Sequence, residues 1–123
     1  MSELVIQFES GATTGQDPVA VASVEGTLIG PLDVQGYDRY GVYAYNVGGG
    51  LGGDLATVRV QASPEDSGPW VDVAEMLLTP LVAGAARFIG LSGRADKYVR
   101  VRAACTADGT TARAWFCAGG YGA

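Results

Sequence analysis

Residues 98–105 read YVRVRAAC, and every second side chain in this stretch is apolar or a cysteine. The positions expected to face a hydrophobic core are Val99, Val101, Ala103 and Cys105. The side chains between them include a tyrosine and two arginines. Because side chains of a β-strand alternate between its two faces, this pattern predicts a strand with one buried face. The stretch LATVRVQA at 55–62 alternates in the same way, with its even-numbered positions expected to face inward.

Further strands are predicted along the chain, separated by segments rich in Gly, Pro, Asp and Ser. The full set of predicted strands is 3–8, 19–24, 38–47, 55–62, 69–74, 86–90, 98–105 and 111–118. Short strands at such spacing are typical of all-β proteins. We therefore expect a single antiparallel β-sandwich, jelly-roll-like, with about eight strands. It should span residues 1–123, with 1–17 as an N-terminal arm and 118–123 as a loose tail.

The composition fits one ordered domain. The chain has 123 residues, of which 48% are hydrophobic and 17% charged, which is too apolar for a disordered chain. No segment is long enough to span a bilayer, and the N-terminus lacks a basic region of the kind that opens a secretory signal. With a net charge of −5 and Lys97 as its single lysine, the chain is a poor candidate for binding nucleic acid.

The charges are divided unevenly along the sequence. Residues 1–86 contain eleven acids and two arginines, whereas residues 87–123 contain six basic residues and two acids. Two interpretations remain open. The split could favour contacts between identical copies, or the opposite charges could meet within one folded domain.

One turn invites a detailed prediction. Asp108-Gly109 has the composition of a two-residue type I′ hairpin turn. In a hairpin of that register Val101 would face Phe116 on the core side. On the other side Arg102 would face Trp115, where the two could form an exposed patch. The same register separates Cys105 and Cys117 on opposite faces, so we expect reduced thiols rather than a disulfide.

Reactive groups are scarce. The chain has no histidine, which removes the most common general base and the most common zinc ligand. Only carboxylate pairs could provide acid–base chemistry, and the candidates are Glu65 with Asp66 and Asp72 with Glu75. The first pair lies in SPEDSGP at 63–69, whose prolines and glycine are typical of a solvated turn. We expect no enzymatic activity, no metal and no cofactor.

Several apolar residues are candidates for contacts with a partner. Leu51 lies in the glycine-rich stretch VGGGLGGDL at 47–55, and Tyr121 lies in the C-terminal tail. The N-terminal strand could add to the sheet of a partner. The candidate interface residues are Leu4, Val5, Ile6, Phe8, Leu51, Arg102, Trp115 and Tyr121.

Aromatic residues give an alternative function. Tyr43 and Tyr45 share one face of the predicted strand at 38–47 and could form a platform on which a sugar stacks. Trp70 would complete this carbohydrate site. The same residues could instead pack within the domain.

Three stretches carry a resemblance to a known group of proteins. They are ASPEDSGPWVDV at 62–73, GRADKYVRVRA at 93–103 and DGTTARAWF at 108–116. Together they resemble the small β-sandwich virion proteins of tailed bacteriophages that decorate or brace capsids. The strand-turn-Trp and Tyr-Val-Arg signatures also resemble discoidin-like, galactose-binding sandwiches. The resemblance covers roughly residues 37–118.

The resemblance to phage proteins implies a function. It implies a decoration protein, made in the host cytoplasm, that binds the outside of the head shell. Its partners would be the major capsid protein and copies of itself, in a trimer, with no nucleic acid and no membrane. A carbohydrate- or receptor-binding module is the alternative, as is another part of the virion such as a tail, neck or head-fibre protein.

Overall fold

A computed structural model describes residues 3–9, 19–48, 53–106 and 110–121, with the backbone alone at 3–9, 19 and 121. Nine strands run through these ranges. They are β1 Glu3–Glu9, β2 Val19–Val21, β3 Gly26–Asp33, β4 Arg39–Gly48, β5 Leu55–Ser63, β6 Val71–Glu75, β7 Ala86–Leu91, β8 Tyr98–Cys105 and β9 Thr110–Tyr121. No helix among the described residues is long and apolar enough to cross a membrane.

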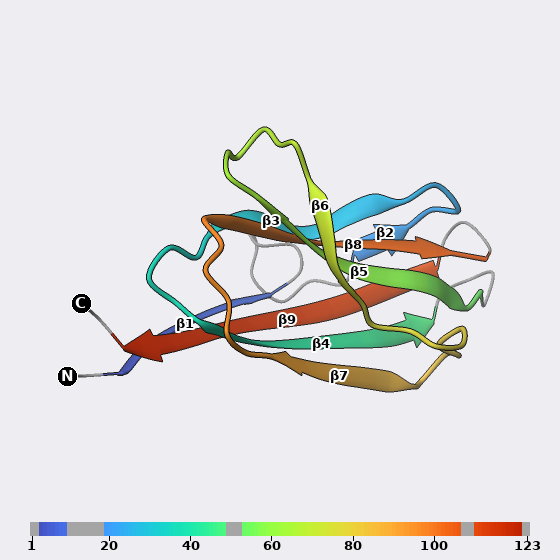
Figure 1. The fold of residues 1–123 in the computed structure, drawn as a ribbon. Coiled ribbons are helices and arrows are strands. Elements are labelled where there is room, and N and C mark those ends of the chain that lie inside the picture. The colour runs from blue at the N-terminus through green and yellow to red at the C-terminus, as the bar shows by residue number, and fades with distance from the viewer. Residues whose placement is uncertain (1–2, 10–18, 49–52, 107–109, 122–123) are drawn as a thin grey trace.

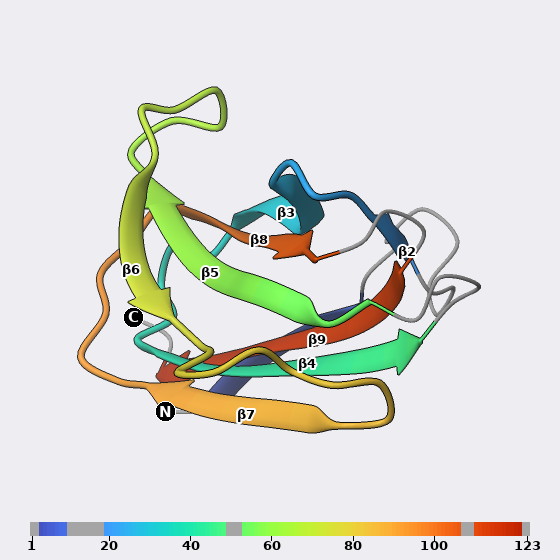
Figure 2. The ribbon, with the colours of Figure 1, turned by 90° about the vertical axis from the view of Figure 1, so that its right-hand side faces the viewer.

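The strands form two antiparallel sheets that face each other (Figures 1 and 2). The first sheet has the order β1-β9-β4-β7, with the short β2 also paired to β9. The second sheet has the order β3-β8-β5-β6. Apart from β2, this alternation of strands between two sheets is that of a jelly roll. The predicted antiparallel, jelly-roll-like sandwich is confirmed.

The core lies between the sheets and is built from alternate residues. In β8 the predicted inward positions are buried, with an exposed fraction of at most 4%. In β9 Phe116 is fully buried, and its ring centroid lies 5.3 Å from that of Tyr40 on β4. The largest fully buried side chains are Phe116, Ile29, Leu55, Val34, Val42, Val58, Val60, Val99, Val101, Asn46 and Thr110. The apolar side chains among them stabilise the sandwich, because folding removes their surface from water.

The predicted β8–β9 hairpin is wrong. β8 lies between β3 and β5 in the second sheet, whereas β9 lies between β1 and β4 in the first. Arg102 and Trp115 are therefore on different sheets, and the exposed patch expected from that pair does not form. The turn composition favours a local hairpin, but in a jelly roll each of these strands pairs instead with strands far away in the sequence. The Asp108-Gly109 turn itself lies outside the described residues.

Two further predictions need correction. The segment around 30–36 was expected to be a connection, yet β3 runs through Gly30 and Pro31, where its register with β8 shifts. Proline is tolerated there because β3 is an edge strand with an irregularity at that point. Leu55 was expected to face outward but is fully buried, because the register of β5 also shifts, between Leu55 and Thr57.

Both ends of the chain take part in the first sheet. Residues 118–121 were expected to form a loose tail, but they continue β9 and pair with residues 3–6 of β1. Glycine suits position 120, since a Cβ added there would lie 3.1 Å from backbone atoms of residues 36–38. Ordinary ladder hydrogen bonds hold β1, so the predicted arm is at least partly a strand of this chain's own sheet.

Candidate functional site

The outer face of the first sheet carries three aromatic side chains side by side, Phe88, Tyr43 and Trp115, here called the aromatic row. Tyr43 on β4 is paired with Phe88 on β7 and with Trp115 on β9. Directly paired residues of antiparallel strands point to the same face. The ring centroids of Tyr43 and Phe88 are 4.6 Å apart, and the two residues are 49% and 51% exposed. The row thus presents a large aromatic surface to solvent.

The aromatic row has charged neighbours of both signs. The guanidinium of Arg113 lies 4.7 Å from the centre of the Trp115 ring, a cation–π distance. On this face β4 and β9 carry Arg39 and Arg113, and β1 carries Glu9, which is paired with Trp115. Glycines beside the row, at Gly41 on β4 and Gly90 on β7, keep neighbouring side chains from covering it. This face suits a partner that offers apolar surface.

The outer face of the second sheet is different, because its charges are paired with one another. Arg59 lies within ion-pair distance of Glu25 at 3.4 Å, Asp72 at 3.3 Å and Glu75 at 3.6 Å. Arg102 lies 3.5 Å from Glu25. Acids from the first part of the sequence therefore do meet an arginine from the last part within one domain, which accounts for some of the uneven charge.

The same network continues toward the β5–β6 turn. Gln61 donates a hydrogen bond to Asp72 at 2.8 Å and accepts one from Arg100 at 2.8 Å. The Arg100 guanidinium lies 4.3 Å from the centre of the Trp70 ring. Burial, and then repulsion from Arg102, lower the pKa of Arg100. The polar groups of this face are engaged with each other, so few of them remain for a partner.

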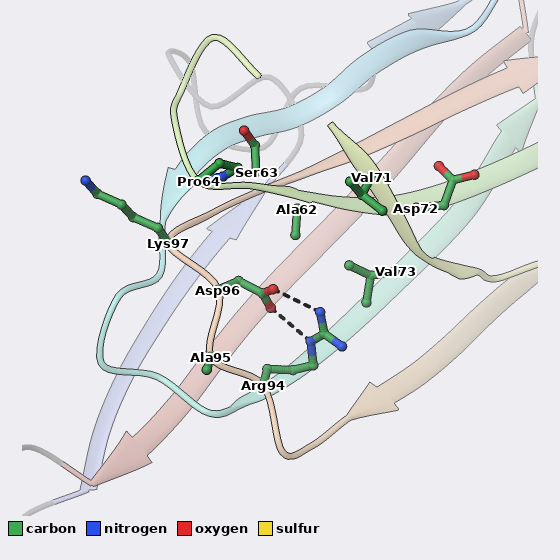
Figure 3. A pocket seen from close by; sticks show the side chains of 10 residues that line it. All are labelled: Ala62, Ser63, Pro64, Val71, Asp72, Val73, Arg94, Ala95, Asp96 and Lys97. Carbon is green, nitrogen blue, oxygen red and sulfur yellow. Dashed lines mark hydrogen bonds and ion pairs between the residues drawn. The ribbon is translucent and has the colours of Figure 1, made fainter. Parts of the chain in front are cut away.

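A groove of about 480 Å³ opens between β6 and the β7–β8 connection (Figure 3). Arg94 donates to the Asp96 carboxylate from Nε and Nη2, both at 2.9 Å. The Tyr40 hydroxyl, reaching from the core, donates to the same carboxylate at 2.8 Å. The groove is lined by Ala62, Ser63, Pro64, Val71, Asp72, Val73, Arg94, Ala95, Asp96 and Lys97.

These hydrogen bonds shift the pKa values of the groups that make them. Burial of Asp96 opposes its ionisation, but the hydrogen bonds from Arg94 and Tyr40 and the positive charge of Arg94 outweigh it, so the pKa of Asp96 is lowered. Burial, and then the hydrogen bond to Asp96, raise the pKa of the Tyr40 phenol. Asp96 is thus held ionised and Tyr40 neutral at neutral pH.

The lowered pKa of Asp96 predicts a loss of stability in acid. Its stabilising contribution is fully present above the ordinary aspartate pKa of about 4 and is lost as the pH falls through the lower pKa of the folded state. Asp96→Asn should cost about 1–3 kcal/mol at pH 7, and the difference from the wild type should shrink below about pH 4. Urea unfolding across this pH range measures both quantities.

Tyr40→Phe is the matched control for this prediction. It removes one donor to Asp96 and keeps the ring in the core, so it should raise the Asp96 pKa and move the acid transition toward higher pH. A difference between wild type and Asp96→Asn that stays constant from pH 7 to pH 2 would contradict the assignment.

The structure separates the residues of the predicted carbohydrate site. Tyr43 and Tyr45 share the outer face of the first sheet, as predicted. Trp70 lies on the second sheet's side, against Arg100. The aromatic neighbours of Tyr43 are instead Phe88 and Trp115. Phe88 was missed because the alternation in 86–90 does not tell which of its two faces is outward.

The other candidate interface residues have different surroundings. Leu4, Val5, Ile6 and Phe8 lie on β1 and pair with Gly120, Gly119, Ala118 and Phe116 of β9. Tyr121 pairs with Glu3, and its side chain lies outside what the structure describes, as does all of Leu51. Among the nine strands, β1 is paired only with β9, so one of its backbone edges faces no described strand.

The carboxylates considered as reactive groups, and Cys105, are exposed on a turn or form hydrogen bonds within the fold. Glu65 and Asp66 are exposed on the β5–β6 turn, as the turn composition predicts. Glu75 accepts a hydrogen bond from the backbone of Val58 at 3.1 Å, next to the β5–β6 pairing. Cys105 donates to the carbonyl of Val21 at 3.3 Å. Within the described ranges, no group of three or more His, Cys, Asp or Glu residues is placed to hold a metal ion.

Comparison with known proteins supports the fold and not a family. No protein-family model and no curated protein sequence matches the chain. A structure of the Bacillus endospore appendages, described as disulfide-linked pili, matches with a TM-score of 0.59 and 15% identity, over 100% of this chain and 93% of that one. The PBSX exported protein XepA matches with a TM-score of 0.61 and 14% identity, over 98% of this chain and 38% of that one.

A viral protein shares the fold as well. The STIV major capsid protein matches with a TM-score of 0.50 and 12% identity, over 96% of this chain and 41% of that one. This chain therefore spans less than half the length of the phage and capsid proteins. At these identities the likeness shows the β-sandwich fold alone, a fold that phage and viral structural proteins share.

Proposed function

We propose that this chain is a non-enzymatic structural protein of a bacteriophage virion, which binds the outside of the head shell and stabilises it. The observation that carries the proposal is the contrast between the two outer faces. The second sheet pairs Arg59 and Arg102 with acids of the same chain, whereas the first sheet exposes the aromatic row on β4, β7 and β9. The fold shared with a phage exported protein and a viral capsid protein supports a virion setting.

The physical mechanism is burial of apolar surface across joints between capsid subunits. Each Å² of apolar surface removed from water contributes about 25 cal/mol. A stable interface buries roughly 1,200–2,000 Å² in total, and the symmetry of a shell repeats that gain many times. The partners would be the major capsid protein and other copies of this chain, which we expect to form a trimer. The backbone edge of β1 that faces no described strand offers a second contact, by strand addition.

Loss of the aromatic row should weaken shell binding. Tyr43→Ala and Phe88→Ala should each raise the dissociation constant about 30-fold, since removal of a central aromatic contact costs about 2 kcal/mol. Co-sedimentation of the purified protein with head shells that lack it measures this change. Both side chains are about half exposed, so their removal should leave the fold intact.

Val71→Ala is the control, because Val71 is also exposed, at 65%, but lies on the second sheet. It should leave shell binding unchanged.

Electron microscopy of purified particles tests the location of the protein on the virion directly. Density over the shell is the expected result, whereas a single ring of copies at the tail or neck would assign the protein to another part of the virion and overturn the proposal.

A second candidate, a carbohydrate- or receptor-binding module, is favoured by the same aromatic row. Exposed aromatic rings are surfaces on which sugars stack, and Arg113 beside Trp115 offers hydrogen-bond donors. The Tyr43→Ala variant separates the two candidates. Saturable binding on a glycan array that this variant loses, together with no binding to shells, would favour the module.

A further inference from the structure

The two sheets end in edge strands of different kinds. In the second sheet β3 contains Gly30 and Pro31 and shifts its register with β8, and the five-residue β6 shifts its register with β5. Prolines, bulges and short length are common devices that keep an edge strand from pairing with another chain. In the first sheet β1 and β7 contain no proline, and their pairing with β9 and β4 runs without a shift. The edges of the first sheet are therefore suited to pairing with a further strand.

The directions and lengths of β1 and β7 fit one another. The two strands lie at opposite edges of the first sheet, and among the described strands β1 pairs only with β9 and β7 only with β4 (Figure 1). Because each neighbouring pair in the order β1-β9-β4-β7 is antiparallel, β7 runs opposite to β1. A second copy placed in the same orientation, with its β1 beside β7, would therefore continue the antiparallel sheet. β1 has seven residues and β7 has six, so nearly the whole of each strand can pair.

The two faces of the sheet leave one register that pairs every residue of β7. Residues that pair directly must lie on the same face. Phe88 lies on the outer face, and the odd-numbered positions of β1 share that face because Glu9 pairs with Trp115. Among these positions, only Gln7 opposite Phe88 keeps all six residues of β7 within the bounds of β1. The pairs between copies are then Ala86–Glu9, Arg87–Phe8, Phe88–Gln7, Ile89–Ile6, Gly90–Val5 and Leu91–Leu4.

This register brings apolar residues together on the inner face. Ile89 and Leu91 are partly buried and pack against the core from the edge of β7. The register places Ile6 and Leu4 of the second copy opposite them. These are inner-face positions, since Ile6 pairs with the buried Ala118 of β9. The joint would therefore remove from water the apolar surface that Ile89 and Leu91 still expose.

Charge favours the pairing of β1 with β7 over the pairing of either strand with itself. β1 contains two acids and no base, whereas β7 contains one arginine and no acid. Two β1 strands in full overlap would place Glu3 opposite Glu9, where like charges repel. Two β7 strands in full overlap would place Phe88 opposite Ile89, although these residues lie on different faces.

We propose that β1 of one copy pairs with β7 of the next copy, so that their first sheets join into one continuous antiparallel sheet. The contact uses two different edges of the same chain and is therefore head-to-tail, which builds a closed ring or an open filament. The joint needs no capsid, so this inference does not rest on the proposed function in a virion.

A charge placed inside the joint tests the proposal. Ile89→Lys should raise the dissociation constant for self-association about 10-fold or more, because a charge that faces inward on an edge strand opposes strand addition. Val73→Lys is the matched control, since Val73 is likewise partly buried against the core, on the edge strand β6 of the other sheet. It should leave the constant within about 2-fold of the wild type. Sedimentation equilibrium of the full chain measures the constants, and far-ultraviolet circular dichroism confirms that both variants are folded.

Disulfide trapping tests the register without changing the core. Cys117→Ser first removes the half-buried native thiol. The double variant Glu9→Cys/Ala86→Cys then places thiols opposite each other between copies, whereas within one chain β1 and β7 are separated by about 14 Å, which is too far for a disulfide. Oxidation should link three or more chains. Glu9→Cys/Gly90→Cys is out of register by about 13 Å and should give at least about 5-fold less of these products.

Several results would overturn the proposal. One is a wild type that stays monomeric at its highest soluble concentration. Another is equal weakening of self-association by Ile89→Lys and Val73→Lys. Cross-linking through position 90 that is as efficient as through position 86 would reject the register. Covalent products that stop at dimers would indicate a two-fold contact in place of the head-to-tail one.

Discussion

Replacing Asn46 with alanine is expected to lower the free energy of unfolding by about 3–5 kcal/mol. Asn46 is fully buried at the end of β4. Its Nδ2 donates to the carbonyls of Gly53 at 3.1 Å and Leu81 at 2.9 Å, and its Oδ1 accepts from the N–H of Gly48 at 2.8 Å. Alanine would leave these backbone groups without their partner in a site closed to water, and each such group costs about 1–3 kcal/mol.

Urea unfolding at pH 7 measures this loss, with Val47→Ala as the matched control. Val47 is the next residue of the same strand, but it points outward and is 39% exposed. Its truncation should cost less than about 1 kcal/mol. If Asn46→Ala cost no more than Val47→Ala, the side chain would not be the link that joins β4 to the segments around residues 53 and 81.

The sequence predicted most reliably those features that depend on a single strand, such as which face each side chain points to. In YVRVRAAC the period of two assigned every side chain to its face, since an antiparallel strand with one buried face must alternate. The prediction failed at Leu55 and at β3, where register shifts interrupt the period. Irregularities of this kind depend on the neighbouring strand, so the pattern of a single strand does not reveal them.

The candidate site was harder to predict from the sequence, because it depends on which strands become neighbours in the sheet. Tyr43 and Tyr45 could be placed on one face from their spacing alone. Phe88 and Trp115 could not be placed beside Tyr43, because β7 and β9 reach β4 only through the pairing of the jelly roll. The Asp108-Gly109 turn pointed to a hairpin, but a turn composition states nothing about the sheet each flanking strand joins.

Replacing Phe116 with alanine is expected to be the most damaging change to the core. Its side chain is the largest of those that are fully buried, and it packs against Tyr40 at a centroid distance of 5.3 Å. Truncation of a buried phenylalanine costs about 3–5 kcal/mol, through lost transfer free energy and the cavity that remains. Domains of this size have about 5–15 kcal/mol in total, so the variant should melt at a much lower temperature in calorimetry.

Trp115→Ala is the control that separates the core from the proposed binding face. Trp115 precedes Phe116 in β9, but its half-buried ring lies on the outer face beside Arg113. Its removal should cost about 1–2 kcal/mol of stability, because only part of the ring is shielded from water. The same variant should lose shell binding, as Tyr43→Ala does. If Trp115→Ala destabilised the fold as much as Phe116→Ala and left shell binding intact, the outer aromatic row would serve packing rather than contact with a partner.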